Sequence, residues 1–315
     1  MNKNKLLIST STFGLIDPTP LEKISQAGFD CILNPYKQTL STQQLIELLD
    51  GVSGLIAGTE KITEEVFKAR PHLKIISRCG AGIDNIDLQA AKKYGIAIAS
   101  TPEAPILSVA ELTLGLMLNV MRSLGLSDRL IRAGKWEKRM GSLLSGKTIG
   151  IIGFGQVGEV LARLLQPFHV KIKAYDVKPR TDTARSLLVE YVDLNELLKI
   201  SDVVTIHLPL NSETKDLINA KTLALMKKEA ILVNTSRGEI IDEEALYNAL
   251  KSERITGAAL DVFTQEPYAG KLRELNNVVL TSHIGSYTAE ARVKMENLAV
   301  ENVLKFFSAH PKDDK

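Results

Sequence analysis

Residues 146–158 read GKTIGIIGFGQVG, and this stretch decides how the chain is expected to fold. Its apolar run, TIGII, predicts a buried strand, and the apolar spacing after the last glycine predicts an amphipathic helix. Between them, Gly153, Gly155 and Gly158 fit the pattern GxGxxG. The pattern alone is weak, but between a strand and a helix it is typical of a loop that binds the phosphates of a dinucleotide.

Each glycine of this loop is required for a different structural reason. The first allows a tight turn, the second lets the backbone approach a pyrophosphate, and the third lets the helix pack close to the strand. The next predicted strand ends at Asp176, where a carboxylate can accept hydrogen bonds from the adenosine ribose and repel a 2′-phosphate. We therefore expect NAD as the cofactor, although the nearby Lys178 and Arg180 leave NADP open.

Composition excludes several classes of partner. The 315 residues are 44% hydrophobic and 24% charged, and a chain of this length is expected to form two domains. The 39 Lys and Arg residues nearly balance 37 Asp and Glu, so neither nucleic acid nor an anionic membrane is expected as the main partner. Apolar runs are too short for a membrane span, and we find no signal peptide. A cytoplasmic globular protein is expected.

Apolar runs alternate with amphipathic helical stretches along most of the chain, including a helix expected over residues 107–132. This alternation predicts parallel sheets with helices on both faces. The expected fold class is therefore α/β, with two doubly wound, parallel-sheet (Rossmann-like) domains. The strands are expected at residues 6–9, 29–33, 54–57, 73–77, 96–99, 148–152, 171–175, 203–207, 230–234, 256–262 and 277–281.

Three polar residues follow late strands of the second predicted sheet: Arg237, Glu266 and His283. Ligands of open parallel sheets bind beyond the carboxyl ends of the strands. An Arg can hold a carboxylate through two parallel N–H bonds, and a His can deliver or remove a hydroxyl proton near neutral pH. A carboxylate beside the other ring nitrogen fixes the tautomer and stabilises the protonated ring. Together they predict hydride transfer to a 2-keto acid.

Upstream, the strand over residues 73–77 is followed by a small loop of Arg78, Cys79, Gly80, Ala81 and Gly82. Its spare N–H donors are expected to bind a substrate carboxylate. No His adjoins Cys79 in sequence, so we do not expect this thiol to be a nucleophile. His207 ends a strand and is expected to line the cofactor site. The other histidines lack metal-ligand spacing, so no metal site is expected; they are His72, His169 and His310.

Seven distinctive segments span nearly the whole chain: SRCGAGIDNIDL, SVAELTLGLML, GKWEKRMGSLLSGKTIGIIGFGQVG, IHLPLNSETKDLIN, LVNTSRGEIIDEEAL, GAALDVFTQEP and TSHIGS. In these segments the chain resembles the D-isomer-specific 2-hydroxyacid dehydrogenases. Within that family it is most similar to the D-3-phosphoglycerate dehydrogenase branch, which belongs to serine biosynthesis.

The resemblance implies an NAD-binding domain over residues 102–285 and a discontinuous substrate domain made of residues 1–101 and 286–315. It implies a homodimer formed through residues 105–146, in which Trp136 reaches toward the partner's active site. It assigns catalysis to the Arg, Glu and His named above. It also implies cofactor contacts at Gly155, Gln156, Val157, Asp176, Leu208, Thr235, Ser236, Asp261 and Ser286.

One position departs from the phosphoglycerate branch. Phosphoglycerate dehydrogenases commonly carry an Arg that contacts the substrate phosphate where this chain has Gly58. A hydroxypyruvate or glyoxylate reductase is therefore the alternative within the family. A nicotinamide-sensing binding protein, similar to the corepressors of the C-terminal-binding-protein branch, is the alternative of a different class.

Overall fold

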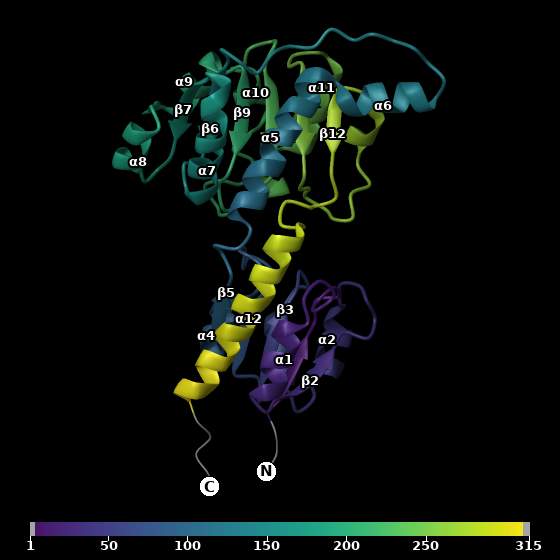
Figure 1. Cartoon of the computed structure of the whole chain (residues 1–315), viewed down its shortest axis with the longest axis vertical. Helices are drawn as coiled ribbons and strands as arrows, with labels where there is room; N and C mark the ends of the chain where they lie inside the picture. The colour runs from purple at the N-terminus through teal and green to yellow at the C-terminus, as the bar shows by residue number, and fades with distance from the viewer. Residues whose placement is uncertain (1–3, 311–315) are drawn as a thin grey trace. The chain divides into compact units, whose positions relative to one another are not determined.

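The computed structural model describes residues 4–310, and the chain divides into two compact units (Figure 1). The first unit comprises the residues up to Pro105 and those from Ser286 onward, and the second comprises Ile106–Gly285. The domain boundaries predicted from the sequence, after residues 101 and 285, stay a prediction. The predicted substrate domain also includes residues 1–3 and 311–315, which lie outside the described part of the chain.

The first unit is built on a parallel sheet with the strand order β2-β1-β3-β4-β5. Successive side chains of β1 point to opposite faces, so Leu6 and Ile8 join one apolar cluster and Leu7 joins another. Helices therefore cover both faces of this sheet. The strands are β1 (Lys5–Ile8), β2 (Asp30–Leu33), β3 (Gly54–Ala57), β4 (Ile75–Arg78) and β5 (Ala97–Ser100). The helices are α1 (Thr19–Gln26), α2 (Thr42–Leu48), α3 (Glu64–Ala69), α4 (Leu88–Lys93) and α12 (Ala289–Ala309).

The second unit holds a parallel sheet with the order β12-β11-β10-β9-β6-β7-β8. In β6, Ile151 packs into one apolar cluster and Ile152 into the other, so this sheet is also covered on both faces. Its strands are β6 (Thr148–Ile152), β7 (Lys171–Tyr175), β8 (Val189–Tyr191), β9 (Val203–Ile206), β10 (Ile231–Asn234), β11 (Gly257–Leu260) and β12 (Val278–Leu280). Its covering helices are α5 (Ile106–Arg122), α7 (Gln156–Leu165), α8 (Thr181–Ser186), α9 (Leu194–Ile200), α10 (Ala220–Leu223) and α11 (Glu243–Lys251).

These two parallel sheets confirm the predicted α/β class. The prediction missed β8, because three residues are too few for a recognisable apolar period.

The prediction of a single helix over residues 107–132 is wrong. The structure has α5 and a separate α6 (Leu124–Arg132), which meet at a bend of 61° visible in Figure 1. Ser123 lies between them in the left-handed region, with φ 51°. The side-chain oxygen of Asn119 accepts the N–H of Gly125 at 3.0 Å, so this N–H has a partner outside the helical ladder. A side chain that enters the ladder in this way ends the helix.

Among residues 4–310, no single helix is long and apolar enough to cross a membrane. In this described part, one bent pair of helices, α5 and α6, is long and apolar enough when the two are taken together. Several residues of α5 are part of the core of the second unit, including Ala110, Leu116 and Met117.

Candidate functional site

The predicted residues of the second unit gather at one edge of its sheet, because the carboxyl ends of parallel strands point the same way. The glycine loop and Asp176 follow β6 and β7, whereas Arg237, Glu266 and His283 lie in the loops after β10, β11 and β12. Strands β7 and β8 extend the sheet on one side of β6, and β9 to β12 extend it on the other. Ligands of open parallel sheets bind where the strand order reverses in this way.

The geometry of the loop after β6 fits a bound dinucleotide. Gly153 has φ +93°, and a Cβ there would lie 2.6 Å from the carbonyl oxygen of His207. A Cβ on Gly158 would lie 2.7 Å from the carbonyl oxygen of Gly153, so helix α7 can approach only because this residue is glycine. At Gly155 no heavy atom lies within 4 Å of the Cβ position. The first and third glycines thus serve the fold, and the second leaves open space over the loop.

The start of α7 provides donors at this open space. The N-cap residue is Gly155, which has no side chain that could cap the helix. In the described part of the chain, no acceptor is found for the N–H groups of Gln156 and Val157. Unpaired N–H groups at a helix N-terminus, together with the positive end of the helix dipole, favour an anion such as pyrophosphate.

The Asp176 carboxylate is held in place beside this loop. One oxygen accepts the N–H of Phe154 at 2.8 Å, and the other accepts the N–H of Lys178 at 2.8 Å. A carboxylate has more acceptor sites than these two bonds use, so Asp176 can still accept hydrogen bonds from hydroxyl groups. Arg180 is one of the two basic residues for which the sequence analysis kept NADP as a possible cofactor. Its guanidinium forms an ion pair with Glu159 at 2.8 Å, so its positive charge is already partly neutralised.

His207 lies next to the glycine loop at the end of β9, where its N–H donates to the carbonyl of Ile152 at 2.8 Å. Burial lowers the pKa of the His207 imidazole to about 4, so the ring is neutral at physiological pH. Its Nε2 lies 3.0 Å from the hydroxyl of Thr205. A neutral, partly buried ring in this position can line a ligand site but is unsuited to proton transfer at neutral pH.

Glu266 and His283 form a pair across the loops after neighbouring strands. The Nδ1–H of His283 donates to Oε2 of Glu266 at 2.8 Å, and the Phe263 N–H donates to Oε1 at 3.1 Å. Partial burial raises the pKa of Glu266, but the bonds from His283 and Phe263 and the charge of Arg237 lower it by more. The net pKa of Glu266 lies below its ordinary value, so its carboxylate is charged when the imidazole needs a counterion. The pairing of Nδ1 leaves Nε2 for a substrate.

The loop that carries His283 is held by Asp261, which is completely buried at the end of β11. Its carboxylate accepts the hydroxyl of Thr281 at 2.6 Å and the N–H groups of Ile284 and Gly285, each at 2.8 Å. These bonds hold His283 at φ 55°, a left-handed conformation that costs free energy without such support. These bonds give Asp261 a role in positioning His283, and the cofactor contact expected at Asp261 stays a prediction.

Arg237 is held by a residue that the sequence reasoning missed. Asn234, buried at the end of β10, donates from its amide to the Arg237 carbonyl at 2.8 Å. Its side-chain oxygen accepts both the N–H and the hydroxyl of Ser236, at 3.0 and 2.8 Å. The Thr235 hydroxyl pairs with that of Thr113 at 2.9 Å. Asn234 could have been found from the sequence, because it is a polar residue at the last position of an otherwise apolar strand.

The Arg237 turn also packs tightly against the Glu266 loop. A Cβ on Gly238 would lie 2.0 Å from the carbonyl carbon of Phe263 and 2.3 Å from the backbone nitrogen of Thr264. Neither backbone can move away cheaply, so only glycine fits at this position. The close approach fixes the Arg237 turn relative to the loop that carries Glu266.

In the first unit, the structure corrects the expected donors of the loop after β4. The Cys79 N–H already donates to the Ala57 carbonyl at 2.9 Å, and the Gly80 N–H to the Thr101 hydroxyl at 2.8 Å. The Cys79 side chain is buried in an apolar cluster, and burial raises the pKa of its thiol to about 11. Spare N–H donors were therefore wrongly expected at Cys79 and Gly80. Within residues 4–310, the N–H groups of Ala81 and Gly82, in the same predicted loop, have no acceptor.

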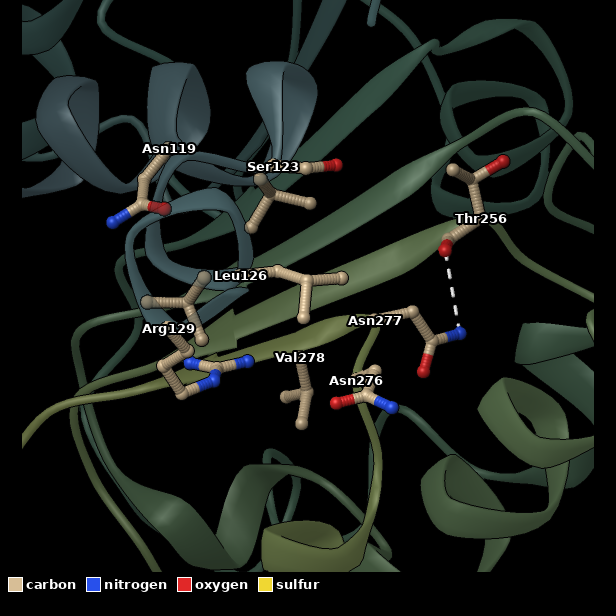
Figure 2. A pocket seen from close by; sticks show the side chains of 10 residues that line it. Asn119, Ser123, Leu126, Arg129, Thr256, Asn276, Asn277 and Val278 are labelled. Carbon is tan, nitrogen blue, oxygen red and sulfur yellow. Dashed lines mark hydrogen bonds between the residues drawn. The ribbon is translucent and has the colours of Figure 1, made fainter. Parts of the chain in front are cut away.

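A cavity of about 60 Å³ lies elsewhere in the second unit, at the amino ends of β11 and β12 (Figure 2). Arg129, Asn276 and Asn277 are among its lining residues, and the Asn277 amide donates to the Thr256 carbonyl at 3.3 Å. It contains none of the predicted site residues, and its volume is far below that of typical ligand pockets. The strand-end residues on the opposite edge of the sheet are therefore the candidate site.

Comparison with known proteins agrees with this geometry. Residues 114–285 match the model of the D-isomer specific 2-hydroxyacid dehydrogenase, NAD binding domain. The chain is 44% identical over 274 residues to a hydroxypyruvate reductase of Thermotoga maritima, covering 84% of this chain and 88% of that protein. It is 40% identical over 272 residues to a D-3-phosphoglycerate dehydrogenase of Methanocaldococcus jannaschii, covering 84% of this chain and 52% of that protein. The crystal structure of D-lactate dehydrogenase from Aquifex aeolicus, complexed with NAD and lactic acid, has a TM-score of 0.85 at 28% identity, covering 97% and 96% of the two chains.

Proposed function

This chain belongs to the D-isomer specific 2-hydroxyacid dehydrogenase family and is an NAD-dependent oxidoreductase, and we propose that Arg237, Glu266 and His283 are its catalytic residues. The observation that carries this proposal is the 2.8 Å pair of His283 and Glu266. The pair stands beside an Arg that Asn234 and the close packing of Gly238 hold in place.

The roles follow from the chemistry of each group. Arg237 binds the carboxylate of the keto acid and polarises the adjacent carbonyl, since its planar guanidinium can donate two parallel hydrogen bonds. When bound, reduced NAD supplies the hydride that adds to the carbonyl carbon. His283 gives the proton on its Nε2 to the carbonyl oxygen, which becomes the product hydroxyl. The Glu266 carboxylate orients the ring and stabilises its protonated form before that transfer.

We propose that the loop of Gly153, Gly155 and Gly158 and the N–H groups at the start of α7 hold the pyrophosphate of the cofactor. The open surface over Gly155 supports this assignment. Asp176 would accept hydrogen bonds from the adenosine ribose, and His207 and Leu208 would line the site at the end of β9. Preference for NAD over NADP is supported by the anchored Asp176 carboxylate and by the engagement of Arg180 with Glu159.

Replacing Asp176 with Ala is expected to weaken NADH binding and to narrow the preference for NADH over NADPH by about tenfold or more. The substitution removes the ribose acceptor and the charge that repels a 2′-phosphate. Steady-state kcat/KM with each reduced cofactor measures the change, and Asp182→Ala, on α8 of the same unit, serves as the control. If the ratio of the two kcat/KM values is the same as in the wild type, Asp176 does not read the ribose.

In the first unit, we propose that the loop after β4 is a binding site for a substrate carboxylate. The unpaired N–H groups of Ala81 and Gly82 support it, and they replace the donors expected from Cys79 and Gly80. The Arg78 guanidinium donates to the Cys79 carbonyl in the same loop.

The family acts on small 2-hydroxy and 2-keto acids, and the named relatives divide between reductases and D-3-phosphoglycerate dehydrogenases. Steady-state assays with glyoxylate, hydroxypyruvate and phosphohydroxypyruvate, each with NADH, test the proposed function. We expect turnover of at least one of these acids. Tight NADH binding without turnover of any would instead favour the sensing protein considered from the sequence.

We also propose the homodimer expected through residues 105–146. The support is a run of exposed apolar side chains in this segment, among which Trp136 and Met140 are 83% and 100% exposed. Sedimentation velocity is expected to show a dimer for the wild type and a shift toward monomer for the Trp136→Ser, Met140→Ser double variant. A wild-type monomer at assay concentration would contradict the proposal.

A further inference from the structure

The segment after β7 contains two basic residues close to the acceptor that we proposed for the adenosine ribose. Lys178 and Arg180 follow Asp176 by two and four residues, and Arg180 is the N-cap residue of α8. In dinucleotide-binding folds, an Arg near the ribose acceptor can receive the 2′-phosphate of NADP. The segment therefore holds a group for each cofactor: a carboxylate that suits NAD and a guanidinium that suits NADP.

The backbone at Arg180 is fixed beside the glycine loop. Its N–H donates at 2.8 Å to the hydroxyl of Tyr191, the last residue of β8. The ring of Tyr191 packs edge-on against Phe154, with the ring centroids 5.9 Å apart. Phe154 lies between the first two glycines of the loop, and its own N–H donates to the Asp176 carboxylate at 2.8 Å. The backbone of Arg180 and the Asp176 carboxylate are therefore held near the same loop residue.

The charges of Asp176 and Arg180 also act on one hydroxyl group. Burial raises the pKa of the Tyr191 hydroxyl and the negative charge of Asp176 raises it further, whereas the N–H and the charge of Arg180 lower it. The net pKa of Tyr191 lies above its ordinary value. Both charged groups thus lie within electrostatic reach of Tyr191, so a 2′-phosphate beside Asp176 is expected to lie within the field of Arg180.

The guanidinium of Arg180, however, is bound to an acid of the chain itself. Its Nη1 lies 2.8 Å from Oε2 of Glu159, in the first turn of α7. Oε1 of Glu159 accepts Nη2 of Arg163, one turn further along the same helix, at 2.9 Å. The Glu159 side chain is only 20% exposed, which weakens the screening of its charge by water. Arg163 therefore fixes the carboxylate where it can hold Arg180.

Arg180 must leave Glu159 before it can bind a phosphate. A guanidinium binds a phosphate tightly when it donates two parallel hydrogen bonds, and a carboxylate competes for the same donors. Lys178 is exposed, but an ammonium binds a phosphate as a point charge without this fork. The pairing with Glu159 therefore removes from the site the cation that is best suited to a 2′-phosphate.

We propose that Glu159 is a specificity-determining residue, which holds Arg180 away from the 2′-phosphate of NADPH and so adds to the preference for NADH that Asp176 gives. The inference rests on the proposed function, in particular on the cofactor contacts of the glycine loop and Asp176. NADH has a hydroxyl in place of the 2′-phosphate and needs no cation there, so the pairing discriminates against NADPH alone.

The first test measures binding without turnover. Glu159→Gln keeps the size of the side chain and removes its charge, and it is expected to lower the dissociation constant for NADPH by about tenfold in isothermal titration calorimetry. The control Glu229→Gln removes a charge from an exposed position before β10, at the opposite edge of the sheet, and is expected to leave this constant unchanged. A Glu159→Gln variant that is folded by circular dichroism but binds NADPH no more tightly than the wild type overturns the inference.

The second test asks whether the effect of Glu159 passes through Arg180. In the wild-type background, Arg180→Ala is expected to raise the dissociation constant for NADPH by less than about threefold, because Glu159 already occupies the guanidinium. In the Glu159→Gln background, the same substitution is expected to abolish the gain, a coupling that a double-mutant cycle measures. A gain that persists without Arg180 would mean that Glu159 acts through its own charge, and this would overturn the inference.

The dissociation constant for NADH separates this inference from the proposed function. A wild-type protein that binds neither NADH nor NADPH would contradict both. Tight binding of NADH, together with an unchanged constant for NADPH in Glu159→Gln, would overturn the inference alone. If Glu159→Gln does not fold, Arg180→Ala in the wild-type background still decides: a loss of NADPH affinity of about tenfold or more would show that Arg180 is not held away from the phosphate.

Discussion

Replacing His283 with asparagine is expected to lower kcat for reduction of the keto acid by at least about 100-fold, the loss typical of removing a general acid. Asparagine is the matched choice because it tolerates the left-handed backbone that His283 adopts at φ 55°. It has no titratable ring, so no proton can be delivered from this position. Single-turnover rates with saturating NADH and keto acid measure the effect directly.

The expected control for this variant is an unchanged dissociation constant for NADH, within about threefold, and an unchanged melting temperature. A kcat within tenfold of the wild type would mean that another group supplies the proton. Glu266→Gln sharpens the test, since it keeps a hydrogen-bond acceptor for Nδ1 but removes the charge. Loss of the carboxylate removes the counterion of the ring that gives the proton, so Glu266→Gln is also expected to lower kcat, by less than His283→Asn does.

Replacing Arg237 with lysine is expected to lower kcat/KM for the keto acid by at least about 100-fold. Lysine keeps the positive charge but cannot present two parallel donors to a carboxylate. Hydrogen bonds to charged groups contribute about 1.5–3 kcal/mol each, and two of them account for a loss of this size. Most of the loss should appear as a raised KM, with a smaller fall in kcat because the carbonyl is less polarised.

Two further variants separate this role from a general loss of positive charge. Arg273→Lys, at an exposed position in the same unit, is expected to change kcat/KM by less than about twofold. Arg237→Ala should recover part of its activity when guanidinium is added to the assay, because the small cation can occupy the space of the missing side chain. A value for Arg237→Lys within tenfold of the wild type would exclude a bidentate contact with the substrate.

Much of the second unit could be predicted from local sequence. The strand, glycine loop and helix of residues 148–165 are encoded within a few residues of one another, so their spacing alone predicts them. The rule that parallel strands end at one edge then brought Arg237, Glu266 and His283 together. The break at Ser123 escaped prediction because the apolar period continues through it, and only the backbone angle and the Asn119 cap reveal it.

Other features of the site could not be predicted because they depend on partners distant in sequence. The role of Asp261 rests on N–H groups more than twenty residues away, and the exact pairing of β11 and β12 decides which of them it reaches. The same holds for the loop after β4, where Ala57 and Thr101 take the donors expected to be free. A sequence motif shows which polar groups are present but not which of them already have partners.

The sequence by itself therefore determined the two parallel sheets, the dinucleotide loop and the residue types of the proposed catalytic set, because each is a local pattern joined to a general rule of sheet geometry. The tertiary structure alone decided which polar groups are already satisfied. It paired Glu266 with His283, buried Asp261 beneath the His283 loop and paired Arg180 with Glu159. These outcomes follow from strand order and register, which bring together residues that are distant in the sequence.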